Sequence, residues 1–336
     1  MLMSIRAFIF MNHLKSYLMY KILKFFLLLV LSLSFTSCGE KKESQTLSVA
    51  TNTWIGYESV YLAQENSFLA KEIKLFRMST PTDVVEAFRM NLTDIAFVTL
   101  AEALYLINQV DEEIKIITII DSSHGADVIL GQNNIKKLSD LKGKAIGVEK
   151  EGIGMYLLLR AFDLDKSINI CDVRVVNTLY SKHEKLFLDK KFSALVTFEP
   201  VKTQLLDKGA NVLFDSSQIP NEIIDVMIVK SSTLKQKKTE IRAFLASWYQ
   251  TQEYIRKHHK EAFAKMALYD GISAEAFKKA TLGIKISSLE ENRIMLSNKD
   301  TLVHKNMKQV IEYLQKNKIL LKEVKINNII SDAYLP

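Results

Sequence analysis

Short apolar runs alternate with longer segments of helical periodicity from residue 46 onward. The runs are rich in Val and Ile and are bounded by polar residues, which is the pattern of buried β-strands. It predicts strands at 47–50, 73–76, 95–98, 114–120, 128–130, 145–148, 173–176, 194–196, 212–214 and 226–229. The segments between them predict helices at 58–70, 82–91, 101–108, 154–162, 181–189 and 200–208. Because strands and helices alternate, we expect an α/β fold whose sheets are open, mostly parallel and flanked by helices.

The strand pattern fades after about residue 233, and helical periodicity takes over. We expect a helical C-terminal tail with helices at 237–258, 274–282, 288–298 and 302–317. A helical tail after two α/β stretches indicates a chain that leaves one lobe, builds a second and returns. We place the two crossings near 127–131 and 225–230. The predicted organisation is lobe 1 at 46–127 and 230–336, and lobe 2 at 128–229.

Residues 1–37 have the pattern of an export signal. Lys21 and Lys24 precede an apolar run at 25–33, and small residues follow before Cys38. The run is shorter than the roughly 20 apolar residues that a membrane-spanning helix needs. We therefore interpret 1–37 as a signal peptide and the polar segment 38–45 as a tether; the alternative is a cytosolic protein with an apolar tail. The start codon stays open between Met1, Met11 and Met19.

Length, charge and cysteine count narrow the class of protein. The chain has 336 residues, 48% of them hydrophobic, which is enough for two packed lobes. Its net charge is +7, but without residues 1–37 the balance is 41 basic against 38 acidic residues. A body so close to neutral argues against nucleic acid as a partner. If Cys38 is processed and lipidated, Cys171 has no partner in the chain, which excludes a disulfide framework.

Candidate ligand contacts follow the predicted strands, because ligands of open α/β sheets sit beyond the carboxyl ends of the strands. Helices that begin there also present free backbone N–H groups. The side chains of Trp54 and Tyr57 offer flat faces, although both rings could instead pack under the first helix. Thr99 can bind a ligand or cap the next helix. The expected ligand contacts are Asn52, Trp54, Gly56, Tyr57, Thr99, Ser122, Ser123, Glu151, Gly152, Ile153, Thr197, Glu199 and Asp225.

Neither a catalytic motif nor a metal-binding motif is present in the sequence. The six histidines show no metal-ligand spacing, and the Gly152-x-Gly154 pair lacks the third glycine of a dinucleotide site. We therefore expect no cofactor, no metal and no enzymatic activity. The sequence also has no Gly-x-x-x-x-Gly-Lys-Ser/Thr phosphate loop, so the chain is not an ATPase.

Several segments, in this order, resemble the solute-binding proteins of nitrate, sulfonate, taurine and thiamine-pyrimidine importers. The matching stretches are 54–58 with 61–63, 140–144 with 146–148, Gly154 with 157–159, 196–200 and 213–220. The resemblance covers roughly residues 46–260. It implies the two-lobed periplasmic-binding-protein type II fold, hinge closure around a small molecule, and delivery to an ABC permease and its ATPase. It further implies a monomer.

The end of the signal region resembles a bacterial lipoprotein signal. Thr36, Ser37 and Cys38 fit that pattern, whereas Phe35 stands where a smaller aliphatic residue is usual. The resemblance implies lipidation of Cys38 and a periplasmic or cell-surface protein held to a membrane.

The charge of the expected site argues against a bare oxyanion as ligand. Anion-binding members of the group often carry Gly-Ser where this chain has Glu151-Gly152. The candidate positions include Glu151, Glu199, Asp121 and Asp225, with Lys150 as the one nearby base. We expect a neutral or cationic, partly flat molecule, for example a pyrimidine-like compound; a sulfonate- or taurine-like ligand is the other option that the resemblance offers. A ligand sensor of the same fold and a thiamine-pyrimidine biosynthetic enzyme are the rival functions.

Overall fold

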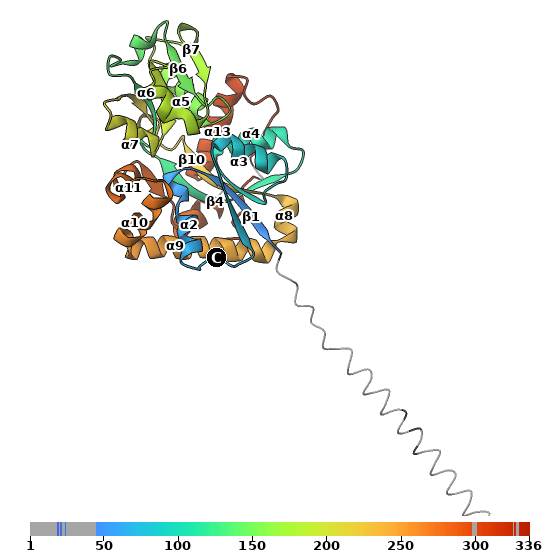
Figure 1. Ribbon diagram of the computed structural model, residues 1–336. Coiled ribbons are helices and arrows are strands. Elements are labelled where there is room, and N and C mark those ends of the chain that lie inside the picture. Colours follow the sequence, from blue (N-terminus) through green and yellow to red (C-terminus); the bar gives the residue numbers. More distant parts are fainter. Residues whose placement is uncertain are drawn as a thin grey trace, which may run out of the picture. The chain divides into compact units, whose positions relative to one another are not determined.

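The computed structural model describes residues 45–297, 301–324, 326 and 329–336, together with Met19, Lys21 and Lys24. The chain divides into two units, Met1–Ser44 and Gln45–Pro336, and the second unit contains both sheets (Figure 1). Apart from these three residues, the predicted signal peptide and the tether up to residue 44, including Cys38, lie outside the described residues. Among the described helices, none combines the length and the apolar character needed to cross a membrane.

A six-stranded sheet forms the centre of lobe 1. Its strand order is β11-β4-β10-β3-β1-β2. β1 pairs in parallel with β2 and β3, whereas β10 runs antiparallel to both β3 and β4, and β11 antiparallel to β4. The bounds are β1 Leu47–Asn52, β2 Ile73–Met78, β3 Ile95–Thr99, β4 Ile114–Ser123, β10 Ile224–Lys230 and β11 Ile284–Ile286.

A five-stranded sheet in the order β7-β6-β8-β5-β9 forms the centre of lobe 2. Its bounds are β5 Asp127–Gly131, β6 Ala145–Val148, β7 Arg174–Asn177, β8 Ala194–Phe198 and β9 Asn211–Asp215. β6 pairs in parallel with β7 and β8, and β5 is antiparallel to β8 and β9. The two-sheet α/β class is thus confirmed, but both sheets are mixed. The reason is that β5 and β10, the strands that follow each crossing, enter their sheets antiparallel to their neighbours.

All ten predicted strands are present, and β11 was not predicted because three residues give too little periodicity. The predicted helices are also present, whereas α8 and α10 were not predicted. The helix predicted at 58–70 ends early because Ser67 adopts a left-handed φ of 58°. The helices are α2 Ser59–Glu65, α3 Pro81–Arg89, α4 Leu100–Gln109, α5 Ile153–Leu164, α6 His183–Leu188, α7 Val201–Leu206, α8 Ser231–Gln236, α9 Lys238–Lys257, α10 His259–Tyr269, α11 Ala274–Thr281, α12 Leu289–Ser297 and α13 Leu302–Lys316.

Two short segments carry the chain between the sheets. The first lies between β4 and β5, and the second lies between β9 and β10. Ser216 in the second segment connects them: its hydroxyl accepts a hydrogen bond from the backbone N–H of Gly125 at 2.6 Å and lies 2.7 Å from the Ser123 hydroxyl. Gly125 has a φ of 106°, which a residue with a side chain rarely adopts. The crossings therefore meet in a small polar joint.

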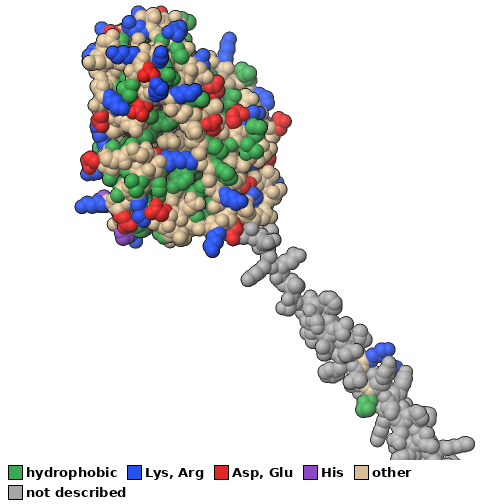
Figure 2. Space-filling model, in the orientation of Figure 1, with side chains coloured by type: hydrophobic (Ala, Val, Ile, Leu, Met, Phe, Trp, Pro, Cys, Tyr) green, Lys and Arg blue, Asp and Glu red, His purple; other side chains and the backbone are tan. Residues whose placement is uncertain are grey.

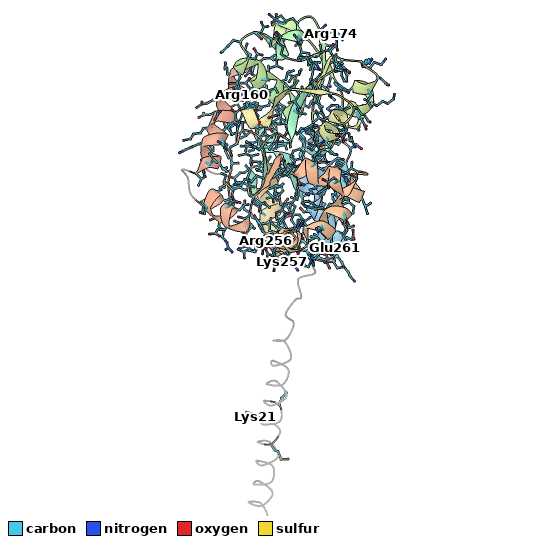
Figure 3. All side chains as sticks on the ribbon, turned by 90° about the vertical axis from the view of Figure 1, so that its left-hand side faces the viewer. Lys21, Arg160, Arg174, Arg256, Lys257 and Glu261 are labelled. Atoms are coloured by element: carbon cyan, nitrogen blue, oxygen red, sulfur yellow. The ribbon has the colours of Figure 1, made fainter. Side chains whose placement is uncertain are left out.

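The C-terminal helix α13 reaches from lobe 1 to lobe 2. It packs on α4, and its Tyr313 ring lies 5.2 Å from the ring of Tyr156 on α5. The guanidinium of Arg160, labelled in Figure 3, lies 5.0 Å over the Tyr313 ring and forms an ion pair with Glu222 in the second crossing. These contacts hold α5, α13 and the crossing together on one side of the molecule.

Candidate functional site

A cavity lies between the two lobes, where strands of both sheets begin or end, and its empty space of about 300 Å³ includes a part that is open to solvent. This is where open α/β sheets place ligands. Lobe 1 contributes the turn after β1, the start of α3, the β3–α4 junction and the start of β10. Lobe 2 contributes the start of β5, the end of β8 and the start of α5. The lining residues are Asn52, Trp54, Tyr57, Pro81, Thr99, Glu102, Asp127, Ile153, Phe198 and Asp225.

Aromatic rings from both lobes form one wall of the cavity. The Trp54 ring makes edge contacts with Tyr57 at 6.4 Å and with Phe198 of lobe 2 at 5.6 Å between centroids. Phe198 is stacked on Tyr180 at 4.0 Å. Trp54 and Tyr57 are buried, so the rings line the cavity and also pack against the core. The packing that the sequence left open for Trp54 and Tyr57 is therefore observed, and their contact with a ligand stays a prediction.

Two aspartates from neighbouring strands face each other beside this wall. Asp121 on β4 and Asp225 on β10 are cross-strand partners, and both are buried. The Trp54 indole N–H donates to Asp121 Oδ2 at 3.1 Å, while Oδ1 of each aspartate has no hydrogen-bond partner. Burial raises the pKa of Asp121 to about 7. It raises the pKa of Asp225 well above its usual value, and the charges of Asp121 and Asp127 add to the shift.

Two further carboxyl groups line the cavity together with Asp225, whereas Asp121 binds the Trp54 indole and is not a lining residue. Burial raises the pKa of Asp127 and of Glu102 to about 7. Asp127 Oδ2 and Glu102 Oε1 are buried without a hydrogen-bond partner. Glu102 belongs to a capping box at the start of α4: Thr99 N–H donates to Glu102 Oε2, and Glu102 N–H donates to the Thr99 hydroxyl. We call Glu102, Asp121, Asp127 and Asp225 the acidic quartet.

No lysine or arginine is among the residues that line this cavity. A second, adjoining cavity shares Pro81, Asp127, Ile153 and Phe198 with it and is lined by His183. Burial lowers the pKa of His183 to about 4, and its ring contacts the Thr197 hydroxyl and the Thr178 carbonyl, so this imidazole is neutral. Unpaired carboxyl oxygens in a lining without lysine or arginine suit a ligand that donates hydrogen bonds or carries positive charge.

The structure brings about half of the predicted contacts to the first cavity. Asn52, Trp54, Tyr57, Thr99, Ile153 and Asp225 line it. Gly152 and Thr197 line the adjoining cavity. Gly56 lies behind the wall, where a Cβ atom would collide with Asp121 Oδ2 and come within 2.6 Å of Trp54 Nε1. A glycine is therefore needed there for the Trp54–Asp121 contact.

Four predicted contacts lie elsewhere. Ser123 belongs to the joint between the crossings, and Ser122 is a half-buried residue of β4 opposite β11. Glu151 is exposed and lines an outer groove beside Lys150. The expected approach of Glu199 to the cleft does not occur in this structure, because its carboxylate accepts hydrogen bonds at 3.0 Å from the backbone N–H and hydroxyl of Thr203.

Sequence reasoning missed Glu102, Asp127, Pro81 and Phe198 as lining residues. A signal existed for Glu102, because Thr99-x-x-Glu102 before an apolar run is a capping-box signature. Asp127 directly follows the first crossing, where the chain passes the cleft. Among the described residues, no group of three or more His, Cys, Asp or Glu side chains is arranged to hold a metal ion.

Three known proteins show the range of functions on similar chains. A Haemophilus influenzae protein named for thiamine biosynthesis is 25% identical over 309 residues, which cover 87% of this chain and 92% of the relative. The alkanesulfonate-binding protein SsuA from Xanthomonas axonopodis pv. citri bound to MOPS superposes with a TM-score of 0.69 at 13% identity, over 87% of this chain and 98% of that one. The desulfurization enzyme DSZB gives a TM-score of 0.64 at 15% identity, over 86% and 97%.

At these identities the two solved structures establish the fold, which is that of periplasmic binding proteins. A family model extends the assignment to the sequence itself: the model of the NMT1-like family matches residues 40–268. This range includes β1 to β10 and every residue that lines the cavity. The chain belongs to the NMT1-like family.

Proposed function

We propose that this protein is an extracytoplasmic solute-binding protein that closes its two lobes around a small, amine-bearing organic molecule. The acidic quartet carries the proposal. Three members of the quartet line a cavity whose lining contains no lysine or arginine, and Asp121 lies beside them as the cross-strand partner of Asp225. All four carboxyl groups are buried, and each has an unpartnered oxygen. Such groups are costly to bury unless a ligand supplies hydrogen-bond donors or positive charge.

A flat heterocycle suits the aromatic wall. The rings of Trp54 and Phe198 come from different lobes and touch edge to face, so a planar ligand that lies against this wall would contact both lobes at once. Aromatic contacts favour edge-to-face or offset arrangements, and an electron-poor cationic ring gains further from the indole face. A pyrimidine-like compound with an exocyclic amine has both required features, and the name of the Haemophilus relative agrees with that choice. A sulfonate is disfavoured because the acidic quartet repels it.

The remaining parts of the proposal concern location and partners. We infer export through the signal peptide at 1–37, lipidation of Cys38 and residence at a periplasmic or cell-surface membrane, with the protein as a monomer. The ligand is then delivered to an ABC permease and its ATPase. For the predicted division into lobe 1 at 46–127 and 230–336 and lobe 2 at 128–229, we propose an earlier second boundary, before Ile224, because β10 belongs to the sheet of lobe 1. A sensor of the same fold would use the same cavity and would differ in its membrane partner.

An enzymatic role is the second candidate, because the desulfurization enzyme has this fold and the Haemophilus relative is named for biosynthesis. Cys171, the described cysteine, is exposed on lobe 2 and is absent from the cavity lining. We therefore propose binding without turnover. The two roles are separated by incubating the protein with its ligand and recovering the ligand unchanged.

Calorimetric titration at pH 8 with 4-aminopyrimidine, 1-methylpyridinium, taurine and methanesulfonate tests the ligand class. We expect the two nitrogen heterocycles to bind at least about tenfold more tightly than methanesulfonate, because one unfavourable charge contact costs on the order of 1.4 kcal/mol. The variant Trp54→Ala serves as the matched control for site-specific binding, and its affinity for both heterocycles should fall. Preferential binding of methanesulfonate would refute this ligand class.

A further inference from the structure

One glutamate joins the two lobes beside the cavity. Glu149 follows β6 in lobe 2 and is 4% exposed. Its Oε1 atom accepts a hydrogen bond at 3.1 Å from the backbone N–H of Thr82 in lobe 1, and a second one from the Thr82 hydroxyl. Its Oε2 atom accepts from the backbone N–H of Tyr180, in its own lobe, at 2.9 Å. Three donors from two lobes therefore converge on one carboxylate.

Glu149 accepts a hydrogen bond from Thr82, whose backbone N–H is the one in the first turn of α3 that has no acceptor within lobe 1. Pro81 begins this helix and has no N–H, and the N–H of Asp83 donates to the Thr80 hydroxyl at 3.1 Å. The N–H of Thr82 has no acceptor in its own helix, and Glu149 supplies one from the other lobe. A helix N-terminus also favours a negative charge, so the carboxylate is stabilised by the helix dipole as well as by the hydrogen bonds.

Glu102 makes the reciprocal approach from lobe 1 to lobe 2. The α5 helix begins at Ile153 without a side-chain cap. Glu102 Oε1 faces this start: a Cβ atom on Gly152 would lie 3.4 Å from it, and the backbone N–H of Ile153 lowers the Glu102 pKa against the larger effect of burial. Glu102 is buried, and Oε1 has no full hydrogen bond. Each lobe therefore points a carboxyl group at a helix N-terminus of the other.

We propose that Glu149 is a positioning residue that latches the two lobes shut, with Glu102 making the second, weaker contact. The proposal rests on the proposed function, because a latch matters only in a protein that opens and closes around a ligand. Both helix N-termini then face carboxyl groups of the protein itself. The lobes can therefore close without an anionic group on the ligand. An anionic ligand could not bind at the N-terminus of α3 or of α5, because a carboxyl group of the protein already faces each one.

The distance between the lobes in the ligand-free protein tests the latch. Nitroxide labels are placed on native Cys171 in lobe 2 and on a Lys74→Cys variant of β2 in lobe 1, in the full chain carrying Cys38→Ser; both label sites are exposed. We expect one short distance in the wild-type protein. In Glu149→Gln an NH2 group replaces one of the two carboxylate oxygens, so one of the hydrogen bonds to Glu149 is lost. The ratio of closed to open molecules should then fall about tenfold, which corresponds to the loss of one buried hydrogen bond.

Two further variants make the result specific. Glu184→Gln removes an exposed carboxylate that pairs with Lys208 inside lobe 2, and it should keep the wild-type distance. Thr82→Ala removes one donor on the opposite side of the latch and should open the lobes even if Glu149→Gln folds poorly. An open wild-type protein, or unchanged distances in both latch variants, would overturn the latch. The titration with heterocycles and methanesulfonate decides the proposed function separately, because it measures ligand preference and not lobe distance.

Discussion

Replacing Arg77 by methionine is expected to lower the free energy of unfolding by about 3–5 kcal/mol, because it leaves two buried carboxylates without their cation. Arg77 lies at the end of β2 and binds Glu58 with both terminal nitrogens, at 3.1 and 2.8 Å. It also binds Asp270, which follows α10, at 2.5 Å. The side chains of Glu58 and Asp270 are fully buried, whereas that of Arg77 is 26% exposed.

The size of this effect follows from burial and not from the number of ion pairs. Burial raises the pKa of both carboxyl groups, and the charge of Asp270 adds to the shift of Glu58. The positive charge of Arg77 opposes both shifts without cancelling them. Urea unfolding at pH 8 measures the loss. The matched control is Arg89→Met, which removes an arginine whose ion pair with Glu86 is about half exposed, and it should change stability by less than about 0.5 kcal/mol. A loss below about 1 kcal/mol in Arg77→Met would contradict the expectation.

The strand ends could be predicted from sequence because periodicity and polar boundaries are local signals. β3, for example, is buried at all five positions and ends at Thr99, which the sequence marks as a cap. The turn after β1 could be predicted for the same reason, and Trp54 and Tyr57 do line the cavity. The two-lobed class followed from the alternation of strands and helices.

Other features depend on contacts between distant segments, which local patterns do not encode. Glu199 was expected near the cleft, but Thr203 lies four residues on and offers two donors to its carboxylate. Ser123 was expected to bind ligand, but Ser216, 93 residues away, holds it in the joint between the crossings. The latch was missed for the same reason, because Thr82 and Glu149 are 67 residues apart. The acidic quartet likewise forms only when β4 and β10 become neighbours.

Acidification from pH 8 to pH 6 is expected to stabilise the ligand-free protein, by about 3 kcal/mol. The cause is the acidic quartet, in which burial raises the pKa of Asp121, Asp127 and Glu102 to about 7. An acid whose pKa is raised on folding binds its proton more tightly in the folded state, so the stability lost at high pH returns as the pH falls through 7. Each carboxyl group contributes about 1.4 kcal/mol over two pH units.

One group opposes this trend and limits the pH window. Burial lowers the pKa of His183 to about 4, so the folded protein binds this proton less tightly than the unfolded chain, and stability is lost below about pH 6.5. Between pH 8 and pH 6 the carboxyl groups stabilise the protein by more than the histidine destabilises it, because the histidine effect is about 1 kcal/mol or less. Urea unfolding at several pH values measures the net change in the free energy of unfolding from the carboxyl groups and the histidine together.

The variant Asp121→Asn assigns the pH effect to the cavity. Its amide oxygen still accepts the Trp54 indole N–H, but the group no longer titrates, so the gain in stability on acidification should shrink by about one carboxyl group's share. A bound cation should act in the same direction at pH 8, because it stabilises the ionised quartet. Saturating 1-methylpyridinium is therefore expected to stabilise the protein more at pH 8 than at pH 6. Stability that falls steadily from pH 8 to pH 6, or an unchanged slope in Asp121→Asn, would show that these carboxyl groups are already ionised without a ligand.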